Sequence, residues 1–369
     1  MKILANVSRI LVGLVFIFSG FVKGVDPLGT AYRIEDYFVA FGTEWAIPFA
    51  LFLSISLCAL EFTLGVSSLL NLRLKILSWP LLLVMAFFTI LTLNDAIYNP
   101  VPDCGCFGDA IKLTNWQTFY KNVVLMALVG IIFIYRKKYM PWLMPVPGNI
   151  AVLFVFLAFA AFSFCEYRHL PMIDFLAWKK GKDMVPENKG VEKVYLNYRN
   201  KTTGETKEYL SPDYPWNDTA WAKEWEFVDQ RIDDSGVIKG HSLHIFDSEG
   251  NELTQNFINN PGYQFLVVAY DLDAGSRKGF ERLDRLYADV AANGHSFVVL
   301  TGSLDEEIEQ FRQGLHPDLE FYHADDVELK MMIRANPGLM LLKDGVVMDK
   351  WNWRDVPSYN KLKEQYPDI

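Results

Sequence analysis

Two cysteines that stand one residue apart are the side chains of this 369-residue chain best suited to chemistry. Cys104 and Cys106 flank Gly105 in the stretch Pro-Asp-Cys-Gly-Cys-Phe-Gly. A disulfide between them would close a very small ring, so it would restrain little chain entropy. Its geometry would also be tight, and strained disulfides exchange most readily. Because Gly105 supplies the backbone freedom that such a ring needs, the spacing favours a redox-active pair.

Other roles for these cysteines stay open. One thiol could pair elsewhere, for instance with Cys165, which ends a later apolar run and could serve as a resolving thiol or as a small packing residue. The pair could also be idle. No further Cys or His stands nearby to complete a four-ligand set, so no metal site is predicted. Cys58 lies inside an apolar run, where burial makes a thiol inert.

Five long apolar runs must position this pair. They cover residues 3–22, 45–70, 76–97, 119–135 and 150–164. Most reach the roughly 20 residues needed to cross the hydrocarbon core of a bilayer. The first run lacks a small-residue cleavage site after it, and charged residues follow at once, so it is interpreted as a retained span rather than a signal peptide. The lipid bilayer is therefore the first predicted partner.

The loops predict the orientation of these spans. Arg73 and Lys75 follow the second span, and residues 136–138 read Arg-Lys-Lys after the fourth. The positive-inside rule places both loops in the cytoplasm. The N-terminus is then inside, while Cys104, Cys106 and everything after the fifth span face the extracytoplasmic side.

Two charges fall inside predicted spans. Arg9 lies in the first span and Glu61 in the second, at a similar expected depth. Charged groups within a bilayer are usually paired or functional. An ion pair between the two helices is the favoured interpretation, and a proton relay for a redox reaction is the alternative.

The first 135 residues resemble a known family. Residues 9–23 read RILVGLVFIFSGFVK and are followed by DPLG, which is similar to the opening of DoxX membrane proteins. Glu61 matches an acidic residue that such proteins often carry, and the Cys-Gly-Cys-Phe-Gly loop resembles the MauE branch. The resemblance implies a four-helix unit that takes part in thiol–disulfide or electron-transfer chemistry. It also implies a membrane quinone as a candidate electron carrier; the residues alone identify no cofactor.

The charges divide the chain into two halves. Residues 1–170 hold 12 of the 35 Lys and Arg residues and 9 of the 44 Asp and Glu residues, so the remainder carries 23 basic and 35 acidic side chains. An acidic soluble half argues against nucleic-acid binding, which needs a basic face. We predict the following domains: a DoxX/MauE-like bundle (1–140), a fifth span (141–165), a linker (166–189), a β-rich extension (190–240) and an extracytoplasmic α/β domain (241–369).

In the last segment strands and helices alternate, and the pattern ends in an antiparallel hairpin after a proline. Strands are predicted at 264–269, 296–300, 320–322, 339–342 and 346–348, with helices between the first four. This order resembles the thioredoxin fold over residues 240–355. The resemblance implies that Pro337, just before the hairpin, is cis and faces the binding site. The Cys-x-x-Cys expected in that family is missing, since residues 271–276 read Asp-Leu-Asp-Ala-Gly-Ser. This domain therefore cannot exchange thiols alone. His241 and His244 lack further ligands and are interpreted as surface residues.

Two functions fit these features. The first is a membrane component of extracytoplasmic thiol–disulfide or electron-transfer chemistry, in which Cys104 and Cys106 act and the C-terminal domain covers the loop or binds a periplasmic thiol protein or peptide. The second is a non-catalytic scaffold with a degenerate thioredoxin-like domain. A transporter is less well supported, because few polar groups lie within the spans. The resemblance places the chain in a bacterial inner membrane.

Overall fold

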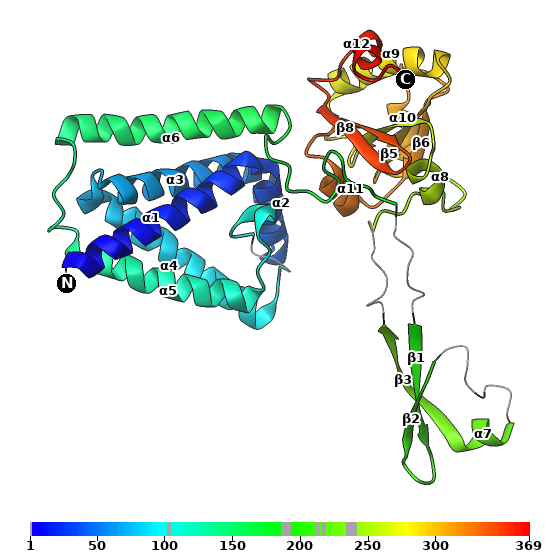
Figure 1. The fold of residues 1–369 in the computed structure, drawn as a ribbon, viewed down its shortest axis with the longest axis horizontal. Coiled ribbons are helices and arrows are strands. Elements are labelled where there is room, and N and C mark those ends of the chain that lie inside the picture. Colours follow the sequence, from blue (N-terminus) through cyan, green and yellow to red (C-terminus); the bar gives the residue numbers. More distant parts are fainter. Residues whose placement is uncertain (1, 102–104, 186–192, 211–214, 216–218, 234–241) are drawn as a thin grey trace.

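The computed structural model describes residues 2–101, 105–185, 193–210, 215, 219–233 and 242–369. Cys104 and His241 lie outside these residues. A helical bundle forms the N-terminal part, an α/β domain lies beyond one end of it, and a small sheet projects away from that domain (Figure 1). The bundle contains α1 (Lys2–Val25), α2 (Pro27–Ala40), α3 (Ala50–Leu70), α4 (Leu74–Tyr98), α5 (Asn115–Tyr135) and α6 (Pro145–Arg168), with short 3-10 turns η1 (Glu44–Phe49) and η2 (Gly108–Ala110).

Five of these helices agree with the predicted spans. By length and composition, α1, α3 with the preceding η1, α4, α5 and α6 could each cross a membrane. Apolar side chains of α1, α3, α4 and α5 meet in one cluster that includes Val12, Leu64 and Val129, and α6 packs on α3 through a second cluster around Phe159. The sequence analysis missed α2, which fills the predicted loop after the first span. Its signal was local: the Asp26 carboxylate caps the helix by accepting from Gly29 N, and Pro27 occupies the first turn.

Helices α1 and α3 run antiparallel and almost touch. A methyl group on Gly13 would lie 2.9 Å from the Leu69 nitrogen, and one on Gly65 would lie 2.6 Å from the Ile17 nitrogen. Small residues permit this backbone approach, which favours helix association in membranes. The contact fixes which residues of the two helices face each other.

The α/β domain has three layers. Its sheet runs in the order β6-β5-β4-β7-β8, with β4, β5 and β6 parallel and β7 and β8 antiparallel to their neighbours. Alternate residues of β4 enter two cores, one under α9 and α12 and the other under α8 and α11. The elements are α8 (Thr254–Ile258), β4 (Tyr263–Ala269), α9 (Arg277–Ala292), β5 (Ser296–Thr301), α10 (Asp305–Phe311), β6 (Glu320–His323), α11 (Asp326–Met332), β7 (Gly338–Lys343), β8 (Val346–Asn352) and α12 (Tyr359–Gln365).

The predicted β-rich extension forms a sheet of its own. Strands β1 (Lys193–Asn200), β2 (Thr206–Leu210) and β3 (Trp225–Asp233) pair antiparallel in the order β2-β1-β3, with α7 (Thr219–Glu224) before β3. Asn200 N donates to Glu205 O and closes the hairpin between β1 and β2. The three strands lie within the range that the sequence predicts to be β-rich.

The predicted linker is, in part, a piece of the α/β domain. Trp178 and Met184 are fully buried in one of its two cores, and Val347 N donates to Lys182 O at 3.0 Å beside β8. The polar composition of this segment concealed the packing, because two large apolar side chains anchor a stretch in which Lys179, Lys180 and Lys182 stay exposed.

Candidate functional site

The close contact of α1 and α3 brings Lys23 to Glu61. The Lys23 ammonium lies 2.5 and 2.6 Å from the two carboxylate oxygens, and the residues are only 5% and 3% exposed. The Lys23 ammonium also lies 5.6 Å from the centre of the Phe88 ring. A buried charge pair is retained only where its geometry satisfies both partners. The two opposite charges therefore satisfy each other inside the bundle, where they link α1 to α3.

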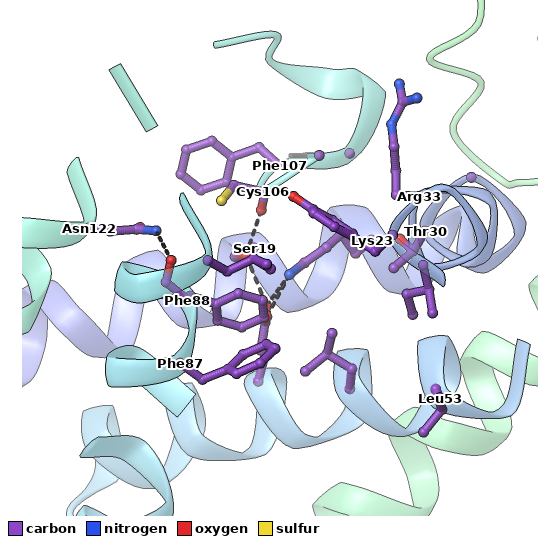
Figure 2. A pocket seen from close by; sticks show the side chains of 18 of the residues that line it. Ser19, Lys23, Thr30, Arg33, Leu53, Phe87, Phe88, Cys106, Phe107 and Asn122 are labelled. Carbon is purple, nitrogen blue, oxygen red and sulfur yellow. Dashed lines mark hydrogen bonds and ion pairs between the residues drawn. The ribbon is translucent and has the colours of Figure 1, made fainter. Parts of the chain in front are cut away.

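Ser19 connects this pair to the cysteine loop. Its hydroxyl lies 2.9 Å from Glu61 Oε2 and 2.8 Å from the carbonyl oxygen of Cys106 (Figure 2). A hydroxyl has one hydrogen, so it donates to one of these two acceptors at a time. The three groups form a continuous polar path from Lys23 to the backbone of Cys106.

The loop that carries Cys106 turns back over the end of α1. Gly105 has φ +63° and Gly108 has φ +53°, values that favour glycine. Phe107 packs edge-on against Phe18 at 5.4 Å, and the Lys121 ammonium lies 4.3 Å from the Phe107 ring centre. These contacts hold Cys106 close to the bundle.

Cys106, Ser19, Lys23 and Glu61 all line one cavity of about 500 Å³. Its other walls come mainly from apolar side chains of α1, α2, α3 and α4, which include Phe87 and Phe88 (Figure 2). An apolar cavity with a few convergent polar groups is the usual form of a small-molecule site. The structure thus joins the predicted residues Cys106 and Glu61 in one place and adds Ser19 and Lys23, which sequence analysis had not selected. Lys23 was visible only as a charge at the end of a span.

The predicted pairing of Arg9 with Glu61 is wrong. Arg9 Nη1 instead donates to the carbonyl oxygens of Ser68 and Leu69, at 2.8 and 2.7 Å, near the end of α3. Because α1 and α3 are antiparallel, Arg9 and Glu61 lie toward opposite ends of the contact. Equal depth was inferred from the position of each residue along its span, and the antiparallel register of α1 and α3 corrects it.

The remaining predicted residues lie apart from the cavity lining. Cys165 is exposed on the last turn of α6, and Cys58 is completely buried in α3 beside Phe159. His244 is exposed and contacts Glu252 at 2.8 Å. Among the described residues, no group of three or more His, Cys, Asp or Glu side chains could hold a metal ion.

The Asn336–Pro337 peptide bond is cis, as the resemblance of the sequence pattern to the thioredoxin fold implied. The carbonyl of Asn336 accepts from Ser276 N at 3.1 Å, and its side chain donates to Asp271 O at 2.6 Å. Ser276 caps α9 through its hydroxyl. The loop at 271–276 and Pro337 therefore meet at one edge of the sheet.

The same edge contacts the bundle through Arg334. Its guanidinium lies 2.8 Å from Asp26 and 2.7 Å from Asp109, and the residue is 4% exposed. Burial lowers the pKa of Arg334, but the two carboxylates outweigh it, so the pKa is raised above its ordinary value. A methyl group on Gly29 would lie 2.9 Å from Arg334 Nη2, so a side chain at this position would push against the guanidinium. Asp109 belongs to the loop that carries Cys106, and Arg334 thus ties the α/β domain to that loop.

A tyrosine pair completes this contact. The Tyr32 and Tyr270 hydroxyls are hydrogen-bonded at 3.0 Å, and their rings pack edge-on. Burial, and then the neighbouring Tyr270, raise the pKa of Tyr32 well above its ordinary value; burial also raises that of Tyr270. Lys350 pairs with Asp174 at 2.6 Å on the domain itself.

Fold and site together define a membrane helical bundle joined to an α/β domain. Residues 1–135, which include α1 to α5, match the model of the family described as methylamine utilisation protein MauE. This match and the five candidate spans indicate a membrane protein with an accessory role. No curated protein matches the chain, and no solved structure matches it.

Proposed function

We propose that this protein is a membrane component of extracytoplasmic thiol–disulfide or electron-transfer chemistry, and that Cys104 and Cys106 are its exchanging thiols. One observation carries the proposal: Cys106 lines an apolar cavity together with the buried Lys23–Glu61 pair, to which Ser19 links its backbone. A cavity with largely apolar walls and a few convergent polar groups is typical of functional sites.

The proposed reaction conserves electrons and protons. A client dithiol attacks the Cys104–Cys106 disulfide through a mixed disulfide, the client becomes a disulfide, and the two cysteines become thiols. Re-oxidation of the pair releases two electrons and two protons to a membrane carrier. Ser19, Glu61 and Lys23 stand where they could accept and pass on those protons, because they form a hydrogen-bonded path below Cys106.

The cavity suits a quinone as that carrier. Its walls are largely apolar, its volume is about 500 Å³, and Ser19 and Lys23 provide hydrogen-bond donors inside it. A quinone bound there would accept two electrons and two protons. Phe87 and Phe88 would hold its ring, and the Lys23 ammonium and the Ser19 hydroxyl would donate hydrogen bonds to it.

The C-terminal domain is proposed to be thioredoxin-like and to lie in the periplasm. The helical bundle would span the bacterial inner membrane, with its N-terminus on the cytoplasmic side. The strand order β5-β4-β7-β8 and the antiparallel hairpin support this assignment. Residues 166–369 contain no cysteine, so the domain would cover the loop or present a peptide or protein client rather than react. Arg334, which binds Asp109, supports the covering role.

A scaffold function is the second candidate, and one observation favours it. The edge that carries Pro337 is joined to the bundle through buried Arg334 and the Tyr32–Tyr270 pair, which leaves the domain docked rather than open to a client. In this function Cys104 and Cys106 would take no part.

Thiol trapping distinguishes the two functions. Membranes are treated with an impermeant maleimide before and after reduction, and the labelled cysteines are identified by peptide mass spectrometry. The redox function predicts a reversible bridge that disappears in Cys104→Ser and Cys106→Ser variants and persists in Cys165→Ser, the matched control on an exposed cysteine. Thiols that stay reduced, with full cellular function of the double Cys104→Ser, Cys106→Ser variant, would establish the scaffold.

A further inference from the structure

A second cavity of about 250 Å³ lies at the opposite end of the bundle, between the start of α4 and the end of α5. Four basic residues line it: Arg73, Lys75, Arg136 and Lys137. The two loops concerned, residues 71–75 and 136–144, contain five basic residues and no Asp or Glu. The described part of the chain offers these four side chains no salt bridge. The positive charge of this cavity therefore lacks a protein counter-charge.

Two of the basic side chains are held in place. The Arg136 guanidinium lies 3.8 Å from the Phe133 ring centre and 5.5 Å from that of Trp79, and it donates to Phe133 O. Arg73 packs along the first turn of α6, since a methyl group on Gly148 would lie 3.1 Å from its Cδ. Its Nε is buried and has no hydrogen-bond partner among the described residues. Positioned donors of this kind bind phosphate groups well.

The start of α4 opens into the same cavity. Leu74 and Lys75 are its first residues and line the cavity, and no side chain caps this helix. The positive end of the helix dipole of α4, which is 25 residues long, adds positive potential. The cavity thus combines two held guanidinium groups, two exposed ammonium groups and the start of a long helix.

Aromatic residues mark the depth of this cavity in the membrane. Trp79 and Trp142 are exposed beside it, and Tyr139, which lines it, donates to Ala5 O at 2.8 Å. Tryptophan and tyrosine concentrate at the level of lipid headgroups. Basic cavities between helices at that level bind anionic headgroups. We infer that this cavity binds a phosphate-bearing anion, and that the phosphate of an anionic phospholipid headgroup is its source in the membrane.

The test uses the full chain in nanodiscs of phosphatidylcholine alone or mixed with phosphatidylglycerol. The shift in unfolding temperature caused by phosphatidylglycerol is measured for the wild type and for the double variant Lys75→Gln, Lys137→Gln. Both side chains are exposed, so the variant should fold. The control is Lys112→Gln, Lys138→Gln, which removes the same charge from exposed lysines that do not line the cavity.

The expected result is a stabilising shift that the control keeps and the cavity variant loses, with affinity for the anionic lipid reduced at least about fivefold. Inorganic phosphate added to neutral nanodiscs forms a separate arm. A shift with phosphatidylglycerol alone identifies a lipid headgroup, and a shift with phosphate as well identifies a site open to soluble phosphate. Equal shifts in the cavity variant and the control, or no shift with either anion, would overturn the inference.

Discussion

The two ends of the helical bundle satisfy charge in different ways. At the end that meets the α/β domain, Lys23 and Arg334 are buried and each contacts carboxylates of this chain. At the other end, Arg9 and Arg136 contact carbonyl oxygens and aromatic rings, and no carboxylate is paired with them in the described residues. The comparison indicates that the first end is a closed, pre-organised site, while the second can accept an external anion.

Removing a carboxylate at the first end should have the largest effect. Glu61→Gln leaves the Lys23 ammonium buried without its counter-charge, which should destabilise the bundle by about 3–5 kcal/mol. Denaturant unfolding in detergent measures this loss, with Glu44→Gln, an exposed acidic residue, as the control. A double variant Lys23→Met, Glu61→Met should recover part of the stability. A loss below about 1 kcal/mol for Glu61→Gln would show that buried Lys23 does not depend on Glu61 for its counter-charge.

The second-largest effect is expected when the ion pairs between the α/β domain and the bundle are removed. Arg334→Leu leaves Asp26 and Asp109 buried and unpaired, and should weaken docking by about 2–5 kcal/mol. Limited proteolysis of residues 166–176 in the intact protein should then become faster. Arg285→Leu, which removes an exposed arginine from α9, should change nothing. Unchanged proteolysis of the Arg334 variant would mean that this ion pair does not hold the domain in place.

A smaller effect is expected at the second end. Arg9→Gln loses two hydrogen bonds to carbonyl oxygens at the end of α3, but it leaves no carboxylate buried without a partner. We therefore expect the free energy of unfolding to fall by about 1–2 kcal/mol. The same denaturant measurement as for Glu61→Gln provides the comparison. A cost as large as that of Glu61→Gln would erase the difference between the two ends.

The tyrosine contact should give the smallest effect and a pH signature. The raised pKa values of Tyr32 and Tyr270 mean that their contribution to docking is complete below their ordinary pKa, near 10, and is lost as pH rises above it. Tyr32→Phe should weaken docking by about 1 kcal/mol at neutral pH.

The weaker docking at alkaline pH is measured as the rate of proteolysis of residues 166–176 over a series of alkaline pH values. The wild type should become sensitive as the pair deprotonates, and Tyr32→Phe should show a weaker dependence on pH. An identical alkaline profile in both proteins would remove the pair from the docking contact.

Local sequence determined the elements of this protein well. Five apolar runs became the five candidate spans, and the alternation and turn signals after residue 190 gave the strands of both sheets. Ser276 capped its helix, and the bond before Pro337 was cis. These outcomes depend on hydrophobic periodicity, capping and proline chemistry, which act over a few residues.

Tertiary packing decided which charges meet. Glu61 could have faced any cation on the first helix, and only the register set by Gly13, Gly20 and Gly65 gives it Lys23 instead of Arg9. Arg334 meets Asp26 and Asp109 across more than 200 residues of sequence, a contact that no local pattern encodes. Side-chain spacing fixes what an element is, whereas the partners of its charges depend on how whole elements pack.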